Sequence, residues 1–147
     1  MGMFDSMHVS ASGLAAERLR MDVIAQNLAN ANSTRGPDGQ PYRRHEVIFR
    51  SADVGTTSGP GRTDEAASGS PLSGVEAAAI VEDTSALRTV YDPSHPDADD
   101  NGYVSYPNVN PVTEMVDMMT ATRAYEANVT AMNAAKNMAL KALDILR

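Results

Sequence analysis

The hydrophobic positions of this chain form a long helical pattern at its C-terminal end. From Met115 onward the apolar positions are spaced alternately three and four residues apart, which keeps their side chains on one face of an α-helix. This stripe comprises Met115, Met118, Thr122, Tyr125, Val129, Met132, Lys136, Ala139, Leu143 and Leu146. Asn110 is a suitable N-cap and Pro111 a suitable first helical residue, so the pattern predicts a helix that fills the C-terminal segment 111–147.

A second stripe occupies the N-terminal segment, 1–34. Strong helix formers fill its centre, and the helix is expected to fade in an Asn-rich run before Gly36 and Pro37. The stripe comprises Leu14, Met21, Ile24, Leu28 and Ala31. Two long amphipathic helices in a short chain need long partners, so we expect them to pair with each other or with neighbouring copies. We therefore predict an assembly seam formed by Leu14, Met21, Ile24, Leu28, Met115, Met118, Tyr125, Val129, Met132, Leu143 and Leu146.

The middle segment, 35–110, favours strands and loops instead. Patterns typical of extended chain cover 42–50, 75–83, 87–91 and 103–110. The stretch 51–74 is rich in Gly, Ser, Thr and Pro, which is typical of an exposed loop or a disordered segment. We predict a mainly α fold, in which long N- and C-terminal helices form a coiled-coil-like pair around a small β-rich and loop-rich middle segment.

The charge and the cysteine content exclude several classes of function. The 147 residues carry a formal charge of -7, and the middle of the chain holds nearly all of the acidic excess. An acidic chain without a basic stripe is unsuited to nucleic acids and to anionic membrane surfaces. The chain has no cysteine, so disulfides and thiolate metal sites are excluded. Its N-terminus lacks the features of a cleaved signal peptide, and no apolar run is long enough to predict a membrane span.

Candidate catalytic or metal-binding chemistry is sparse. Residues 97–102 resemble the first half of an EF-hand calcium loop, but the position that should be Glu is Asn108, and an acidic turn is the simpler interpretation. His8, His45 and His95 lack partners at metal-ligand spacing, and no nucleophile elbow or phosphate loop is present. We expect no catalytic, cofactor-binding or metal-binding residues. The alternative is a metal-dependent enzyme using Asp92, His95, Asp97 and Asp99.

Motifs at both ends of the chain carry a family resemblance. Residues 10–17 read Ser-Ala-Ser-Gly-Leu-Ala-Ala-Glu, and residues 24–34 read Ile-Ala-Gln-Asn-Leu-Ala-Asn-Ala-Asn-Ser-Thr. Together they resemble the N-terminal motif of the bacterial flagellar rod and hook family, whose usual ending is Asn-Thr-Thr. On the C-terminal helix, Glu-Met at 114–115 and Arg-Ala-Tyr-Glu-Ala-Asn at 123–128 are similar to the same family.

The middle of the chain narrows the resemblance to the proximal-rod subunits of this family. The matching residues are Tyr-Asp-Pro-Ser-His-Pro at 91–96, Gly-Tyr-Val at 102–104 and Pro-Asn-Val-Asn at 107–110. The positions taken over as family motif residues are Asn27, Asn30, Asn32, Pro107, Asn108, Asn110, Arg123, Tyr125 and Asn128.

This resemblance implies a structural role. Members of the family leave the cell through the flagellar type III export apparatus without a cleaved signal, and they stack helically around a central export channel. Their terminal helices form an inner tube, and the middle segment forms an outer part. The rod crosses the periplasmic space and transmits torque for motility. The implied partners are copies of the chain, other rod subunits, and basal-body components on the MS-ring and export-gate side and on the distal-rod side.

One alternative of a different class remains for the same helical pattern. A soluble adaptor or export chaperone would also carry paired terminal helices and no active site. Self-assembly and incorporation into basal bodies distinguish a rod subunit from such an adaptor.

Overall fold

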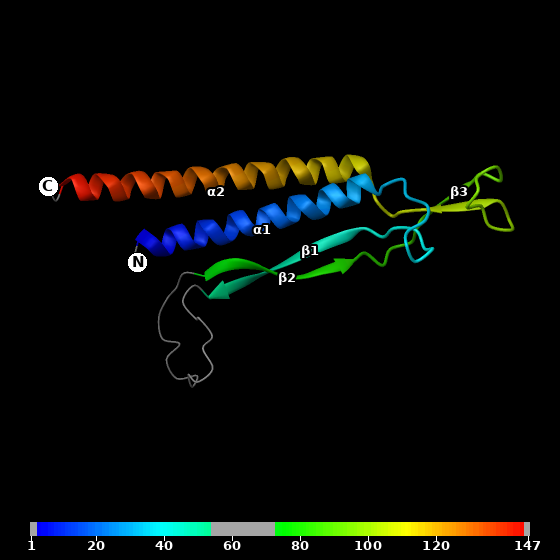
Figure 1. Ribbon diagram of the computed structural model, residues 1–147, viewed down its shortest axis with the longest axis horizontal. Coiled ribbons are helices and arrows are strands. Elements are labelled where there is room, and N and C mark those ends of the chain that lie inside the picture. The colour runs from blue at the N-terminus through cyan, green and yellow to red at the C-terminus, as the bar shows by residue number, and fades with distance from the viewer. Residues whose placement is uncertain (1–2, 54–72, 146–147) are drawn as a thin grey trace, which may run out of the picture.

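The computed structural model, which describes residues 3–53 and 73–145, has a long helix at each end of the chain, and its strands lie between them in the sequence. The elements are α1 (Met3–Ala29), β1 (His45–Asp53), β2 (Ser73–Glu82), β3 (Arg88–Tyr91), β4 (Tyr103–Tyr106) and α2 (Pro111–Ile145). The mainly α fold with a small strand-containing middle segment is therefore confirmed (Figure 1). The loop predicted around 54–72 and the last stripe residue, Leu146, lie outside the described residues.

The two helices lie side by side and run antiparallel (Figure 1). Gly13 of α1 faces Asn128 of α2, and the hydroxyl of Thr122 donates a hydrogen bond to the sulfur of Met21 at 3.7 Å. A Cβ atom added at Gly13 would lie 2.9 Å from the side-chain nitrogen of Asn128. The glycine therefore lets the helices approach closely at the middle of the pair.

At three positions of the predicted stripe, Met115, Thr122 and Lys136, the residue just before it is the buried one. The buried residues of α2 recur at intervals of seven and are small or polar, as the set Glu114, Ala121 and Ala135 shows. The predicted positions Met115 and Leu143 are instead 48% and 64% exposed. The close approach of α1 favours the small side chains of Ala121 and Ala135, and Glu114 is held in place by its hydrogen bonds. The other half of the stripe, Met118, Tyr125, Met132 and Ala139, is half-buried.

Strands β1 and β2 form an antiparallel hairpin against the opposite side of α1. Val47 and Phe49 of β1 line the same cavity as Val23 of α1, whereas the intervening Ile48 lies exposed. This alternation is the ordinary side-chain pattern of a strand with one covered face. A bulge interrupts the register between Ile48 and Phe49. The molecule thus has three layers, with α1 between α2 and the hairpin.

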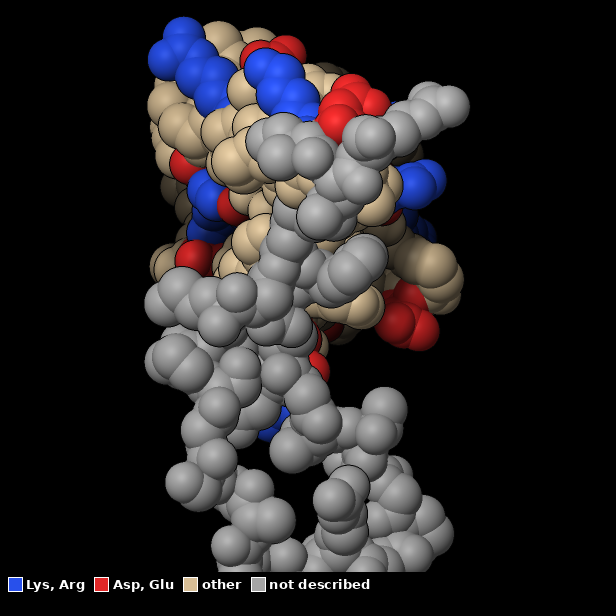
Figure 2. Space-filling view, turned by 90° about the vertical axis from the view of Figure 1, so that its left-hand side faces the viewer, with Lys and Arg blue, Asp and Glu red and all other residues tan. Residues whose placement is uncertain are grey.

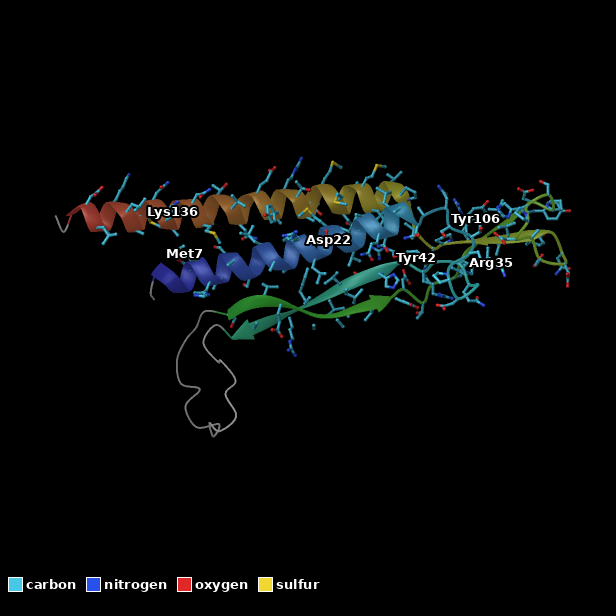
Figure 3. The ribbon with its side chains drawn as sticks, in the orientation of Figure 1. Met7, Asp22, Arg35, Tyr42, Tyr106 and Lys136 are labelled. Atoms are coloured by element: carbon cyan, nitrogen blue, oxygen red, sulfur yellow. The ribbon has the colours of Figure 1, made fainter. Side chains whose placement is uncertain are left out.

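Strands β3 and β4 form a second antiparallel hairpin beyond one end of the helix pair. Figure 3 shows Tyr106 of this hairpin, with Tyr42 and Arg35 in the segment that connects α1 to β1. The turn before β4 needs glycine at position 102. Its φ is +80°, and a Cβ atom there would lie 2.9 Å from the ring of Tyr91.

The start of α2 follows the sequence prediction, whereas β4 ends earlier than the predicted extended stretch 103–110. The side chain of Asn110 accepts a hydrogen bond from the backbone N–H of Val112 at 3.0 Å, and α2 begins at Pro111. The predicted N-cap is therefore confirmed. Strand β4 ends at Tyr106 because Pro107 has no backbone N–H to donate to a ladder.

We expect replacement of Gly13 by Leu to force the helices apart, because the new side chain would meet Asn128. Overpacking of this kind costs about 1–3 kcal/mol. Urea unfolding followed by circular dichroism measures the effect. Ala15→Leu is the matched control, because Ala15 lies exposed on the same helix. Equal stability of the two variants would contradict the close approach at Gly13.

Candidate assembly interface

A cluster of polar side chains lies where the end of α1, the start of β1 and the start of α2 meet. We call it the polar junction, and it consists of Asn27, Tyr42, Arg44, His45 and Glu114. Glu114 is fully buried and Asn27 is 1% exposed. A buried polar group destabilises a fold unless its hydrogen bonds are made, so the partners of these two side chains decide whether the segments can meet here.

The side-chain amide of Asn27 uses its full hydrogen-bonding capacity. Its nitrogen donates to the carbonyl oxygen of His45 at 2.8 Å and to the carboxylate of Glu114 at 3.0 Å. Its oxygen accepts from the backbone N–H of His45 at 2.9 Å and from the hydroxyl of Tyr42 at 2.9 Å. One side chain of α1 thereby fixes both the first residue of β1 and the first turn of α2.

Arg44 balances the buried charge of Glu114. Its Nε donates to the second carboxylate oxygen of Glu114 at 2.6 Å, and its other nitrogens lie 3.7 Å from Glu46 and 3.6 Å from Asp117. The hydrogen bond to Glu114 is the main cause that raises the pKa of the Arg44 guanidinium above its ordinary value. A short charge-assisted bond of this kind is stronger than a bond between neutral groups.

Tyr42 closes the junction on its outer side. Its hydroxyl lies 2.9 Å from the Nδ1 of His45 while also bonding to Asn27. Burial is the main cause that raises the pKa of the Tyr42 hydroxyl, and the carboxylates of Glu114 and Glu82 add to the effect. The segment before β1 is therefore ordered by side-chain bonds. This explains why β1 starts at His45 and not at the predicted residue 42.

Asn108 connects the junction to the loop after β2. Its oxygen accepts from the backbone N–H of Arg44 at 2.8 Å, and its nitrogen donates to Ser85 Oγ at 2.8 Å and to the carbonyl of Asp83 at 3.1 Å. Hydrogen bonds from Ser85 lower the pKa of the Asp83 carboxyl below its ordinary value. The neighbouring Pro107 is fully buried. Four separate segments of the chain are thus joined within one hydrogen-bonded region.

The structure brings some of the family motif residues together and leaves others apart. Asn27 and Asn108 lie in or beside the junction, and Asn110 caps α2. Asn128 faces Gly13, and Asn30 bonds to the carbonyl of Gln26 within its own helix at 2.9 Å. The remaining motif residues are the buried Pro107, the half-buried Tyr125 and the exposed Asn32 and Arg123.

The predicted seam residues divide by burial within the single chain. Ile24 is buried. The half-buried ones are Leu14, Met21, Met118, Tyr125, Val129 and Met132. Leu28, Met115 and Leu143 are exposed, with Leu28 at 36%. Part of each stripe therefore holds the helices of one chain together, and part remains available to a neighbour.

Apart from Asn27, the sequence does not identify the residues of the junction as a site. Glu114 belongs to a family motif, and Tyr42, Arg44 and His45 fall within the predicted strand 42–50. A usable signal was present in α2, because Glu114, Ala121, Asn128 and Ala135 recur every seven residues as small or polar positions. The pairing of Arg44 with Glu114 depends on tertiary structure, so no local sequence pattern predicts it.

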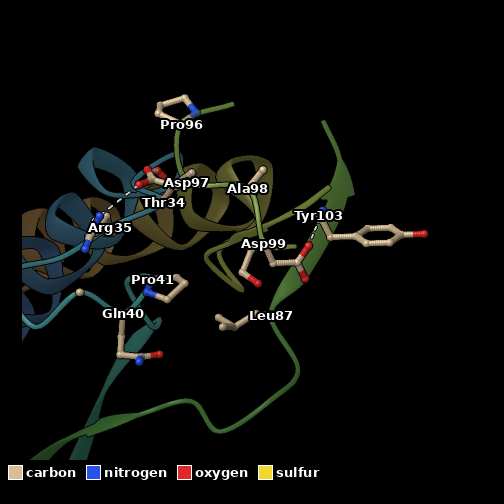
Figure 4. A pocket seen from close by; sticks show the side chains of 12 residues that line it. Thr34, Arg35, Gln40, Pro41, Leu87, Pro96, Asp97, Ala98, Asp99 and Tyr103 are labelled. Carbon is tan, nitrogen blue, oxygen red and sulfur yellow. Dashed lines mark hydrogen bonds and ion pairs between the residues drawn. The ribbon is translucent and has the colours of Figure 1, made fainter. Parts of the chain in front are cut away.

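The acidic loop 97–102 closes a shallow cleft beside the second hairpin (Figure 4). Asp97 accepts a hydrogen bond from Thr34 at 2.8 Å and pairs with Arg35 at 3.6 Å. Asp99 accepts from the backbone N–H groups of Asn101 and Tyr103 at 2.9 and 2.8 Å. Its carboxylate is therefore engaged in turn formation, and Asp97 fastens the loop after α1 to this hairpin.

Residues 3–53 and 73–145 bear on two further classes of site, metal centres and membrane-spanning helices. In this part of the chain, no three His, Asp or Glu side chains form a group that could hold a metal ion. Over the same residues, neither helix combines the length and the apolar character that crossing a membrane requires.

Removal of the Glu114 side chain is expected to destabilise the junction strongly. Glu114→Ala leaves Arg44 and the amide of Asn27 without their partner, and we expect the free energy of unfolding to fall by about 2–3 kcal/mol. Urea unfolding of the purified chain measures this change. Glu126→Ala is the matched control, since Glu126 lies exposed on the same helix. If both variants unfold at the same urea concentration, the junction does not stabilise the fold.

Models of two protein families match the two ends of the chain. The model described as flagella basal body rod protein matches residues 7–37, which cover most of α1. The model described as flagellar basal body rod FlgEFG protein C-terminal matches residues 100–145, which include β4 and α2.

Curated relatives match the chain over its whole length. The flagellar basal-body rod proteins FlgC of Borreliella burgdorferi and Bacillus subtilis are each 48% identical to it, covering 100% and 99% of this chain and 99% of each relative. The FlgC protein of Salmonella typhimurium is 41% identical, and the match covers 99% of this chain and 98% of that protein. The chain belongs to the FlgC family of flagellar basal-body rod proteins.

Proposed function

We propose that this chain is a structural subunit of the proximal rod of the bacterial flagellum. In this role it stands in the basal body, within the periplasmic space, and transmits torque from the motor toward the hook. It acts by assembly and not as an enzyme, and it needs no cofactor. Membership of the FlgC family supports this function, and the exposed apolar residues of its terminal helices are the structural observation that carries it.

Several large apolar residues of the helices are exposed in the single chain. The buried residues of the described part are mostly Ala and Val, whereas Leu28, Met115 and Met119 are exposed. Clusters of exposed apolar side chains are typical of surfaces that contact another molecule. In the proposed rod, neighbouring subunits cover these side chains, and the Met residues adapt to neighbours that differ in sequence.

The layered fold suits a tube that carries torsion. We assign α1 and α2 to the inner tube around the export channel, and the middle segment 35–110 to the outer part. The polar junction prevents the helices from sliding along each other, because sliding would separate Glu114 from Asn27 and Arg44. A subunit with such a fixed register passes a twisting force to its neighbours without first deforming.

Assembly requires several partners. The proposed ones are copies of this chain, other rod subunits, the components on the MS-ring and export-gate side, and those on the distal-rod side. The chain reaches them through the flagellar type III export apparatus, without a cleaved signal peptide. The competing proposal, a soluble adaptor or export chaperone, requires no incorporation into the basal body, so incorporation separates the two.

Aspartate substitutions on the predicted seams are expected to block assembly while leaving the chain folded. Leu28 is 36% exposed and Val129 is half-buried, so an Asp at either position stays hydrated in the single chain. A neighbouring subunit that covers the position would bury an unpaired charge, which is costly. We therefore expect the Leu28→Asp and Val129→Asp chains to be exported but to be absent from isolated basal bodies. Cells that carry either variant should be non-motile. Immunoblots of culture fractions and of basal bodies measure this.

Leu28→Met is the control, because it keeps the position apolar and of similar volume. We expect this strain to swim and to build normal basal bodies. Circular dichroism of the purified Asp variants shows whether their helix content matches that of the unmodified chain. Motile Asp strains with the protein in their basal bodies would contradict an assembly role for these positions.

A further inference from the structure

The turn that leads into β4 contains the single Asn-Gly sequence of the chain, Asn101-Gly102. An asparagine before a glycine is prone to spontaneous deamidation, because glycine has no Cβ atom to hinder its backbone nitrogen when that nitrogen attacks the asparagine side chain. Asn101 is exposed, and none of the hydrogen bonds in the described part of the chain engages its side-chain amide. The carbon under attack is therefore accessible, and the neighbouring backbone decides whether the reaction proceeds.

The turn holds the attacking nitrogen in hydrogen bonds that oppose this reaction. The backbone N–H of Gly102 donates to the carbonyl oxygen of Asp99 at 2.9 Å. The carbonyl oxygen of Gly102 accepts from the backbone N–H of Asp92, also at 2.9 Å. Attack requires that the Gly102 nitrogen lose its proton and point its lone pair toward the side chain of Asn101. The bond to Asp99 must therefore break before the reaction can begin.

Asp99 holds this turn closed through its backbone and its carboxylate. Its backbone N–H donates to the carbonyl oxygen of Tyr103 at 2.9 Å. Its carboxylate accepts from the backbone N–H groups of Asn101 and Tyr103 at 2.9 and 2.8 Å, and bonds to a charged acceptor are stronger than bonds between neutral groups. The pairing of Tyr91 with Tyr103 begins directly after the turn. Asp99 is therefore a positioning residue for the Gly102 nitrogen.

We propose that Asn101 is a site of spontaneous deamidation and that the turn held by Asp99 controls its rate. The reaction takes place in chains whose turn is open, either because the whole chain is unfolded or because the second hairpin opens locally. This inference does not depend on the proposed function, since the reaction needs only the chain and water. The modified fraction therefore increases with the time that a chain spends before the turn has formed.

The reaction proceeds in two steps, with water as the co-reactant. The nitrogen of Gly102 attacks the side-chain carbon Cγ of Asn101, so an N–Cγ bond forms. The bond from Cγ to the side-chain nitrogen breaks, and that nitrogen leaves as ammonia with the proton that the Gly102 nitrogen gave up. Water then adds to one of the two carbonyl carbons of the five-membered ring and opens it. The product is aspartate, or isoaspartate when the main chain runs through the former side-chain carbon.

Isoaspartate does not fit the closed turn. It adds one main-chain carbon just before Gly102, whose φ is +80° and whose two backbone hydrogen bonds fix its place. The surroundings are tight, because a Cβ atom at Gly102 would lie 2.9 Å from the ring of Tyr91 and 3.2 Å from the Cβ of Pro93. A lengthened chain cannot keep both bonds in this space, so isoaspartate loosens this end of the second hairpin.

Both products also add a negative charge to an acidic part of the molecule. Asp92, Asp99 and Asp100 lie around the turn, and no Lys or Arg occurs from residue 89 to residue 122. The second hairpin lies at the end of the molecule away from both chain ends (Figure 1). Figure 2 views the opposite end and shows Lys and Arg side chains beside the acidic ones there. Deamidation therefore increases the difference in charge between the two ends.

The rate of deamidation in folded and unfolded chains tests the proposal. The purified full chain is incubated in mildly alkaline buffer, with and without guanidinium chloride, and peptide mass spectrometry follows the conversion of Asn101. We expect conversion to be slower by about tenfold or more without the denaturant, because the turn must open first. Asp99→Ala removes the carboxylate that closes the turn, so we expect its conversion without denaturant to be faster by about tenfold than that of the unmodified chain.

Three variants serve as controls. Asp100→Ala is matched to Asp99→Ala, because Asp100 lies exposed in the same loop, and it should react at the rate of the unmodified chain. Asn101→Gln should show no conversion at this position, because glutamine would have to form a larger ring. Asp99→Asn keeps a neutral acceptor and should react at an intermediate rate, and circular dichroism establishes that each variant is folded.

Three results would overturn the proposal. Absence of conversion at Asn101 in guanidinium chloride would show that the position is not a deamidation site. Equal rates with and without the denaturant would show that the turn does not control the reaction. Folded Asp99 variants that react as slowly as the unmodified chain would remove Asp99 from the account.

Discussion

The fold depends on one buried carboxylate. Glu114 has no exposed surface, and its two oxygens are bonded to Asn27 of α1 and to Arg44 before β1. A buried charge without these partners would destabilise the fold, so the three segments must come together for any of them to take its place. The position of Glu114 in the first turn of α2 also suits the positive end of the helix dipole. This junction sets the register of the helix pair and, through Asn108, ties in the loop after β2.

The rest of the interior is built from small side chains, and this shapes what the chain can do. Ala16, Ala121 and Ala135 are buried, and Gly13 lies against Asn128, so the helices approach closely while burying little apolar area. The larger residues Met115, Met119 and Leu143 remain outside. In the proposed rod, neighbouring subunits would bury the apolar side chains that are exposed in the single chain. In the proposed role, the small buried residues determine how the two helices pack within one chain, and the large exposed residues contact other subunits.

The sequence predicted the elements well and the contact surfaces only in part. Asn110 and Pro111 predicted where α2 begins, because both residues suit a helix N-terminus. The stripe from Met115 predicted how long α2 is. Within the single chain the packed face of α2 includes Glu114 and Ala121, whereas the predicted stripe has Met115 and Thr122, one residue further on. Nothing local indicates that a carboxylate will be buried, since its partners Asn27 and Arg44 are distant in the chain. Asn27 and Asn108 belong to family motifs, but the motifs do not say what these side chains do. The structure shows that both hold the segment before β1 through hydrogen bonds.

Cryo-electron microscopy of isolated basal bodies tests the central claim most directly, namely that the junction fixes a helix pair whose outward apolar residues are buried by neighbouring rod subunits. The account predicts density for this chain in the rod, with α1 and α2 paired antiparallel and with Glu114 bonded to Asn27 and Arg44 as in the single chain. It also predicts that Leu28, Met115 and Leu143 lie in contact with atoms of other chains. Rod density without this chain would contradict the account, as would a rod in which the helices have separated or these three side chains face solvent.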